Sequence, residues 1–150
     1  MGRDIGYRSI LVPVADNEET DQALDVACRL AAEHGASITA VAVVEVPSFL
    51  PLDAHMFDEE VAAKQLLHRA DAVGESYGIH VVPRVVRGRE AGEVLAEEAD
   101  SRRADLVVVG ARRRGRKPFG HTVEAVLRHA PCRVLLIAPP AEVLATRAAA

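Results

Sequence analysis

The chain has 150 residues, of which 49% are hydrophobic and only 3% are aromatic, and its net charge is −4. This length fits a single domain that buries about two thirds of the surface of the unfolded chain. The shortage of aromatic rings and the absence of an overall basic footprint argue against a nucleic-acid partner. We therefore expect one aliphatic core.

The cysteines and the N-terminal stretch bear on the compartment. Cys28 and Cys132 fall in different predicted elements and lack a CxxC spacing, so a reduced, cytoplasmic protein is the default expectation. The opening stretch MGRDIGYRSI has no apolar signal-peptide core. No apolar run reaches the roughly 20 residues that a membrane-spanning helix needs. The sequence predicts a cytoplasmic chain without a membrane span.

Short apolar runs alternate with helical patterns along the chain. In order, we predict a strand at 10–14, a helix from the caps Asp16 and Asn17 to Gly35, a strand at 38–46, a helix at 59–77 with Val61 on its inner side, a strand at 79–86, a helix at 90–103, a strand at 106–109, a helix at 122–129 and a strand at 134–137. Pro83 indicates an edge strand or a bulge.

This alternation predicts a doubly wound α/β domain over residues 1–140, with a five-stranded parallel sheet and helices on both faces. Residues 141–150, AEVLATRAAA, read as a weakly ordered tail. In such sheets, ligands bind beyond the carboxyl ends of the strands, where the strand order reverses. That rule directs attention to the residues that follow the predicted strands.

The stretch VVVGARRRGRKPFGHTVEAV, residues 107–126, follows this rule most clearly. Gly110 ends an apolar strand, and Gly120 precedes a helix. Glycines can bring backbone N–H groups close to phosphate, and a helix N-terminus favours anions, although both glycines would serve equally well as simple turns. His121 and Thr122 could donate to the same phosphate. Thr122 alternatively suits an ordinary N-cap.

The loop 111–119 contains five positive charges in an otherwise acidic chain: Arg112, Arg113, Arg114, Arg116 and Lys117. Arginine side chains could clamp phosphate directly. They could instead contact an acidic protein or anionic lipid, or form a solvated surface loop. The residues alone leave these three readings open.

Signals for catalysis and metal binding are weak. The histidines lack a metal-ligand spacing, and the carboxylates of helical segments such as EVLAEEAD read as solvated surface. Asp16 is the one acid placed at the carboxyl end of a strand, where it could hold a ribose hydroxyl or a magnesium ion. We expect no metal of the protein's own and no enzyme activity beyond, at most, slow ATP hydrolysis.

Several stretches resemble the universal stress protein family. ILVPV with its acidic turn, GASITAVAVVEVP, DLVVVGARRR and GHTVEAVLRHAPCRVLLIAP resemble successive parts of that family over residues 7–140. The resemblance implies a strand order of 3-2-1-4-5. It also implies a homodimer formed through the last strand: Val134, Leu135, Leu136 and Ile137.

Some members of the family bind ATP or another adenine nucleotide through a Gly-x2-Gly-x9-Gly-Ser/Thr pattern. Gly110 and Gly120 match its first and last glycines, but Arg113 replaces the second glycine and the spacing is three residues short. His121 replaces the Ser/Thr, and Ala15 takes the position of the usual aspartate, with Asp16 one residue later. These departures weaken the pattern without removing either of its ends.

The resemblance implies a regulatory module that binds ATP, with magnesium, or AMP. Val12, Pro13 and Val14 would lie beside the base, Val43 would offer backbone contacts, and Asp16 would face the ribose. The phosphates would be surrounded by Gly110, Arg112, Arg113, Gly120, His121 and Thr122. The alternative is a nucleotide-independent, dimeric interaction domain. The stretch EVP-x3-PLDA with the basic loop also resembles universal-stress domains at the cytosolic tails of bacterial amino-acid permeases, so a membrane transporter is a candidate partner or fusion.

Overall fold

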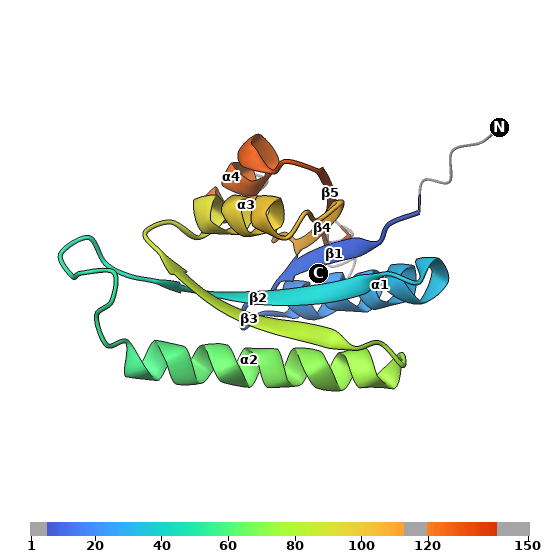
Figure 1. Ribbon diagram of the computed structural model, residues 1–150, viewed down its shortest axis with the longest axis horizontal. Coiled ribbons are helices and arrows are strands. Elements are labelled where there is room, and N and C mark those ends of the chain that lie inside the picture. The colour runs from blue at the N-terminus through green and yellow to red at the C-terminus, as the bar shows by residue number, and fades with distance from the viewer. Residues whose placement is uncertain (1–5, 113–119, 141–150) are drawn as a thin grey trace, which may run out of the picture.

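The computed structural model describes residues 6–112 and 120–140 and contains four helices and five strands within these ranges (Figure 1). In chain order the elements are β1 (Ser9–Pro13), α1 (Glu18–His34), β2 (Ser37–Glu45), α2 (Phe57–Ser76), β3 (Val81–Gly88), α3 (Ala91–Ser101), β4 (Leu106–Gly110), α4 (His121–His129) and β5 (Arg133–Ile137). The predicted alternation of strands and helices is confirmed. The predicted tail 141–150 lies outside the described residues.

The strands form one parallel sheet in the order β3-β2-β1-β4-β5, which confirms the predicted order. The chain builds outward from β1 to β3 and then returns to place β4 on the other side of β1. The order therefore reverses between β1 and β4. Pro83 lies in the edge strand β3, whose pairing with β2 is continuous from Val81 to Gly88 without a bulge.

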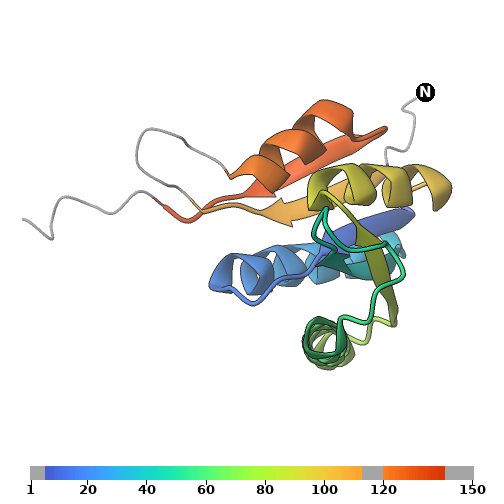
Figure 2. The ribbon, with the colours of Figure 1, turned by 90° about the vertical axis from the view of Figure 1, so that its left-hand side faces the viewer.

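Two helical layers cover the sheet, α1 and α2 on one face and α3 and α4 on the other (Figure 2). Alternate strand residues serve the two layers, because successive side chains of a strand point to opposite faces. Ile10 and Val12 of β1 pack in the core under α1 and α2, whereas Leu11 packs under α3 and α4. The neighbouring strands β1 and β4 are thus buried on both faces, as their uninterrupted apolar runs predict.

The start of α1 is fixed by two side-chain hydrogen bonds. The Asn17 side chain accepts from the backbone N–H of Thr20 at 2.8 Å, and the Thr20 hydroxyl accepts from the backbone N–H of Ala15 at 3.1 Å. Asn17 is therefore the N-cap, and Asp16 is left free for other contacts. At the other end Gly35 has a φ of 67°, a left-handed conformation that favours glycine.

Two details of the helices differ from the sequence predictions. Val61 was expected on the inner side of α2, but it is 39% exposed, because this helix packs through a narrow stripe formed by Ala63, Leu67, Ala70 and Gly74. Helix α4 begins one residue earlier than expected. Gly120 is its N-cap and Thr122 lies within the first turn, so the prediction that Thr122 caps this helix is wrong.

Candidate functional site

The candidate site lies where β1 and β4 end, at the point of strand-order reversal. Leu11 pairs with Val107, so Val14 and Gly110, each three residues further along, reach the same level at the edge of the sheet. Val14 remains attached to the sheet through its N–H, which donates to the Val41 carbonyl oxygen at 2.9 Å. The structure therefore brings together the two chain turns that the sequence singled out.

Gly110 is required by packing whatever else it does. A Cβ atom at this position would overlap the carbonyl oxygen and carbonyl carbon of Glu19 in the first turn of α1. The end of β4 thus approaches the start of α1 more closely than a residue with a side chain allows. Gly120 differs, since a Cβ atom built there meets no described atom within 4 Å. Only the first of the two glycines has a steric reason in the described fold.

The residues after β1 divide into a buried and an exposed group. Val12 and Val14 are buried, and Pro13 is half-buried. The side chain of Asp16 is 86% exposed and accepts a hydrogen bond from Arg69 of α2 at 3.2 Å. The same guanidinium group lies 3.5 Å from Asp21. Arg69 therefore bridges the two acids at this corner and brings α2 to the edge of the site.

The backbone polar groups of Val43 lie beyond the end of β1. Strand β2 extends four residues beyond the pair formed by Pro13 and Val41, so Val43 lies past the end of β1. Alternate residues of a parallel strand direct their N–H and C=O groups to the same neighbour. Because the Val41 carbonyl faces β1, the polar groups of Val43 face the space beyond Val14.

The start of α4 forms the other wall of the site. Its N-cap, Gly120, provides no side-chain acceptor for the N–H groups of the first turn, which begins with His121 and Thr122. His121 is 81% exposed and lies 3.8 Å from Glu90, just before α3. A helix start of this kind presents N–H groups and a positive dipole end to an anion.

Arg112 is held at the entrance by the first turn of α1. Its Nε donates to Glu19 at 3.1 Å, and the Glu19 side chain is only 12% exposed. One positive charge of the loop 111–119 is therefore already matched by a carboxylate. Arg113, the other arginine predicted at the site, lies outside the described residues.

The hollow beside the end of β1 is small. Val14, Ala15 and Arg69 line a pocket of about 10 Å³ between α1 and α2, too small for a base. This hollow beneath α2 therefore cannot hold a base.

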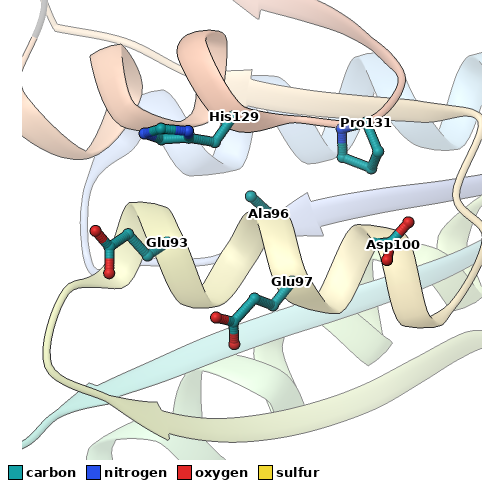
Figure 3. A pocket seen from close by; sticks show the side chains of 6 residues that line it. All are labelled: Glu93, Ala96, Glu97, Asp100, His129 and Pro131. Carbon is teal, nitrogen blue, oxygen red and sulfur yellow. The ribbon is translucent and has the colours of Figure 1, made fainter.

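Another hollow, of about 380 Å³, lies beside α3 and the C-terminal end of α4 (Figure 3). Glu93, Glu97 and Asp100 of α3 line it together with His129 and Pro131. Its carboxylates have the wrong sign for phosphate. Among residues 6–112 and 120–140, the structure forms no group of three or more His, Cys, Asp or Glu side chains that could hold a metal ion.

Sequence reasoning missed a buried ion pair on the α3 face of the sheet. Glu98, expected on a solvated surface, is 7% exposed; it accepts from Arg84 at 3.0 Å and from Arg102 at 3.4 Å. The helical period did contain a signal, since Glu98 lies three residues after buried Leu95 and just before buried Ala99.

It also missed how the segment between β2 and α2 is held. Arg87 at the end of β3 donates to the carbonyl of Ala54 at 2.7 Å and pairs with Glu60. Arg89 donates to the carbonyl of Leu50 at 2.7 Å. These arginines fix a segment from which Phe49 and Phe57 project, 83% and 73% exposed.

Together, a parallel sheet whose strand order reverses between β1 and β4, and helices on both of its faces, define a doubly wound α/β domain. The model of the universal stress protein family matches residues 6–138. The chain belongs to the universal stress protein family.

Relatives and solved structures agree with this assignment. A universal stress protein of Synechocystis is 30% identical over 139 residues, covering 92% of this chain and 85% of the relative. One from Methanocaldococcus jannaschii is 27% identical over 143 residues, covering 89% and 84%. The structure of an Archaeoglobus fulgidus universal stress protein superposes with a TM-score of 0.76 at 24% identity, covering 87% of this chain and 98% of the other.

Two further solved structures carry nucleotides. A universal stress protein in complex with cAMP has a TM-score of 0.72 at 22% identity and covers 88% of this chain and 97% of the other. The Archaeoglobus fulgidus protein in complex with dAMP has a TM-score of 0.72 at 21% identity, covering 89% and 99%. At these identities the likeness shows a shared fold.

Proposed function

We propose that this chain is a regulatory module that binds an adenine mononucleotide across the carboxyl ends of β1 and β4. The observation that carries the proposal is the convergence of the β1 turn, Gly110 and the start of α4 at the point of strand-order reversal. Proteins of the same fold bind cAMP and dAMP, which supports a ligand of this class.

Each part of the edge would have one task. The base lies beside Val12, Pro13 and Val14 and takes hydrogen bonds from the backbone of Val43. Asp16 receives a ribose hydroxyl. The phosphate contacts the first turn of α4, where His121 and Thr122 can donate hydrogen bonds to it. Gly110 and Gly120 lie on either side of the phosphate. Arg112 and Arg113 would add charge, the former after exchanging its contact with Glu19 for the phosphate.

The surroundings of Asp16 favour a mononucleotide over ATP with magnesium. Arg69 already donates to this carboxylate at 3.2 Å, and a guanidinium group at that distance competes with a divalent cation. Asp16 therefore fits a ribose hydroxyl better than a metal ion. We expect AMP to bind without added magnesium.

Ligand binding would be read out by a second copy of the chain. Strand β5 is an edge strand in which Val134, Leu135, Leu136 and Ile137 are all half-buried. Ile137 accepts from Ala111 at 2.8 Å, so by alternation Leu136 directs its N–H to the open edge. We infer a homodimer through this edge, in the cytoplasm, with the nucleotide altering the surface that the dimer offers to a partner.

A second candidate is a dimeric interaction domain that binds no nucleotide, for example beside a membrane transporter. The observation that favours it is the occupancy of two proposed ligand groups by protein, Asp16 by Arg69 and Arg112 by Glu19. No helix in the described part of the chain is long and apolar enough to cross a membrane.

Calorimetric titration with AMP, cAMP and ATP tests the first candidate against the second. We expect saturable heat with AMP, and about tenfold weaker binding in Asp16→Asn, because the ribose hydroxyl then donates to a neutral amide oxygen instead of a carboxylate. Asp21→Asn is the matched control, since it also removes a carboxylate partner of Arg69 but none of the ligand. Absence of heat up to millimolar nucleotide would leave the interaction domain.

The dimer is tested separately by light scattering. Leu136→Pro removes the outward N–H of β5 while sparing the hydrogen bond that Ile137 accepts from β4, so the fold should persist and the dimer should dissociate. A wild-type chain that is monomeric at all concentrations would contradict this interface.

A further inference from the structure

A polar pocket of about 460 Å³ lies at the end of the sheet opposite the nucleotide edge. It opens between the amino-terminal halves of β1, β2 and β3 and the last turn of α3. Its polar lining includes Ser9, Thr39, Arg84, Glu98, Ser101 and Arg102. We call this hollow the amino-end pocket.

The sheet register explains why the pocket is polar. Thr39 precedes Val41 by two residues on β2, so the two side chains share a face, and Val41 belongs to the core under α3 and α4. Val41 is covered, whereas at the level of Thr39 polar side chains replace the apolar core. Ser9, which pairs with Ser37 at the very start of the ladder, continues this polar strip.

The charges of the pocket do not cancel. The buried carboxylate of Glu98 forms ion pairs with both guanidinium groups, with its Oε1 3.0 Å from Arg84 Nη2 and 3.4 Å from Arg102 Nε. Two positive charges therefore face one negative charge. Arg84 and Arg102 remain partly accessible, with side chains 42% and 32% exposed, so their remaining N–H groups can reach a solute.

Donors are in excess as well. Thr39 is only 8% exposed, yet its hydroxyl makes no hydrogen bond with another residue of 6–112 or 120–140. Within the same ranges, the Nε of Arg84 is buried and has no acceptor, and Arg102 uses only its Nε. A buried polar group without a partner is costly, and such groups are normally satisfied by protein, water or a ligand. Of these donors the Arg84 Nε is the fully buried one, and a solute rich in acceptors would supply the partner that it lacks.

We propose that the amino-end pocket binds a phosphate group, as free phosphate or as the phosphate monoester of a small polyhydroxy compound. The oxyanion accepts from Arg102, Arg84 and the Thr39 hydroxyl, and it balances the second guanidinium charge. The volume exceeds that of phosphate alone, and the hydroxyls of Ser9 and Ser101 suit the hydroxyls of an attached polyol.

This site is distinct from the proposed nucleotide edge. It lies at the opposite ends of the same strands and shares no residue with that edge. Its ligand would stiffen the contact between α3 and the edge strand β3, because Arg84 comes from β3 and Glu98 and Arg102 come from α3 and its C-cap. Occupation could thus be sensed without any nucleotide.

The test is a titration of the isotope-labelled chain, followed by amide NMR spectra at constant ionic strength. Inorganic phosphate, ribose 5-phosphate and ribose are added in separate series. We expect saturable shifts at Thr39, Ser101 and Arg102 with both phosphates and none with ribose. Tighter binding of ribose 5-phosphate than of phosphate would identify a monoester as the ligand, and equal binding would identify phosphate itself.

Two variants decide whether the pocket residues hold the anion. Arg102→Gln should weaken binding by about tenfold, the effect of one charged hydrogen bond, while the Arg84–Glu98 pair is preserved. Thr39→Val removes only the hydroxyl, keeps the shape and strand preference of the side chain, and should weaken binding several-fold. Arg29→Gln, an equal loss of charge on an exposed face of α1, should leave binding unchanged.

The proposal is overturned by three results. One is the absence of saturable shifts at these amides. Another is a set of shifts confined to His121, Thr122 and Val123, which would place the phosphate at α4 only. The third is unchanged affinity in Thr39→Val, the variant least able to disturb folding. Each leaves the nucleotide proposal untouched, since that ligand is titrated at the other end of the sheet.

Discussion

The two ends of the sheet are built from different kinds of polar group. At the carboxyl end, backbone groups and a helix start are exposed by glycines, and the nearby charged side chains, Asp16 and Arg112, are already paired with other residues. At the amino end, the charged side chains themselves form the hollow, with Glu98 buried between two arginines. A site made of backbone is indicated by chain turns, whereas a site made of side chains depends on how distant elements pack.

At the carboxyl end, the two glycines should differ in how much they contribute to stability. Gly110→Ala should lower the free energy of unfolding by about 3 kcal/mol, because the new Cβ atom overlaps the backbone of Glu19. Gly120→Ala should change it by less than about 0.5 kcal/mol, since its φ of −74° suits alanine and the space is open. Urea unfolding of both variants measures this contrast. Equal stability of the two would mean that β4 and α1 are not in close contact.

At the amino end, the buried carboxylate should matter more than its exposed neighbour. Glu98→Gln keeps the shape but removes the charge that Arg84 and Arg102 share, and we expect a loss of about 2 kcal/mol. Glu97→Gln, on the exposed side of the same helix, should stay within about 0.5 kcal/mol of wild type. Thermal unfolding of the two variants decides the matter. Matching melting temperatures would show that the ion pair of Glu98 is exposed to solvent and contributes little to stability.

Between the two ends, Cys28 reports on the core itself. Burial, and then the nearby charge of Asp25, raises the pKa of this thiol from 9.0 to about 11. Well below pH 9 the thiol is protonated in both the folded and the unfolded chain. Above pH 9 the thiol ionises in the unfolded chain first, so the free energy of unfolding falls as the pH rises toward 11. The thiol should account for about 1.4 kcal/mol of this loss near pH 10.

The measurement is urea unfolding of wild type and Cys28→Ala across this pH range. The stability advantage of wild type should shrink between pH 9 and 11 and be constant below pH 8. A pH-independent difference would mean that water reaches Cys28 in the folded chain.

Features with a local sequence pattern were predicted correctly, whereas features that depend on packing between elements were not. The apolar runs of β1 and β4 and the caps Asn17 and Gly35 are local, and the elements they predict are confirmed. Val61 and Glu98 were misassigned, because the width of a helix's buried stripe depends on what faces it. Thr122 was misplaced as a cap, since α4 begins one residue earlier, at His121.

The candidate site shows the same division. Sequence pointed to Gly110, Gly120 and Asp16 because turns after strands are readable along the chain. The sequence did not indicate the partners of these residues. Gly110 packs against Glu19, and Asp16 pairs with Arg69, and in both pairs the two residues are far apart along the chain. Nor did the sequence place Thr39 and Arg102 at one pocket.

By itself, the sequence determined the alternation of strands and helices and the family, because periodicity and turn residues act over a few neighbours. The edge where a ligand should bind is a prediction from the same turn residues. Only the tertiary structure decided that Gly110 is needed by α1, that Arg69 and Glu19 already occupy the charged groups of that edge, and that Glu98 is buried at the other end. Those outcomes depend on contacts between segments 14 to 93 residues apart, which no local pattern specifies.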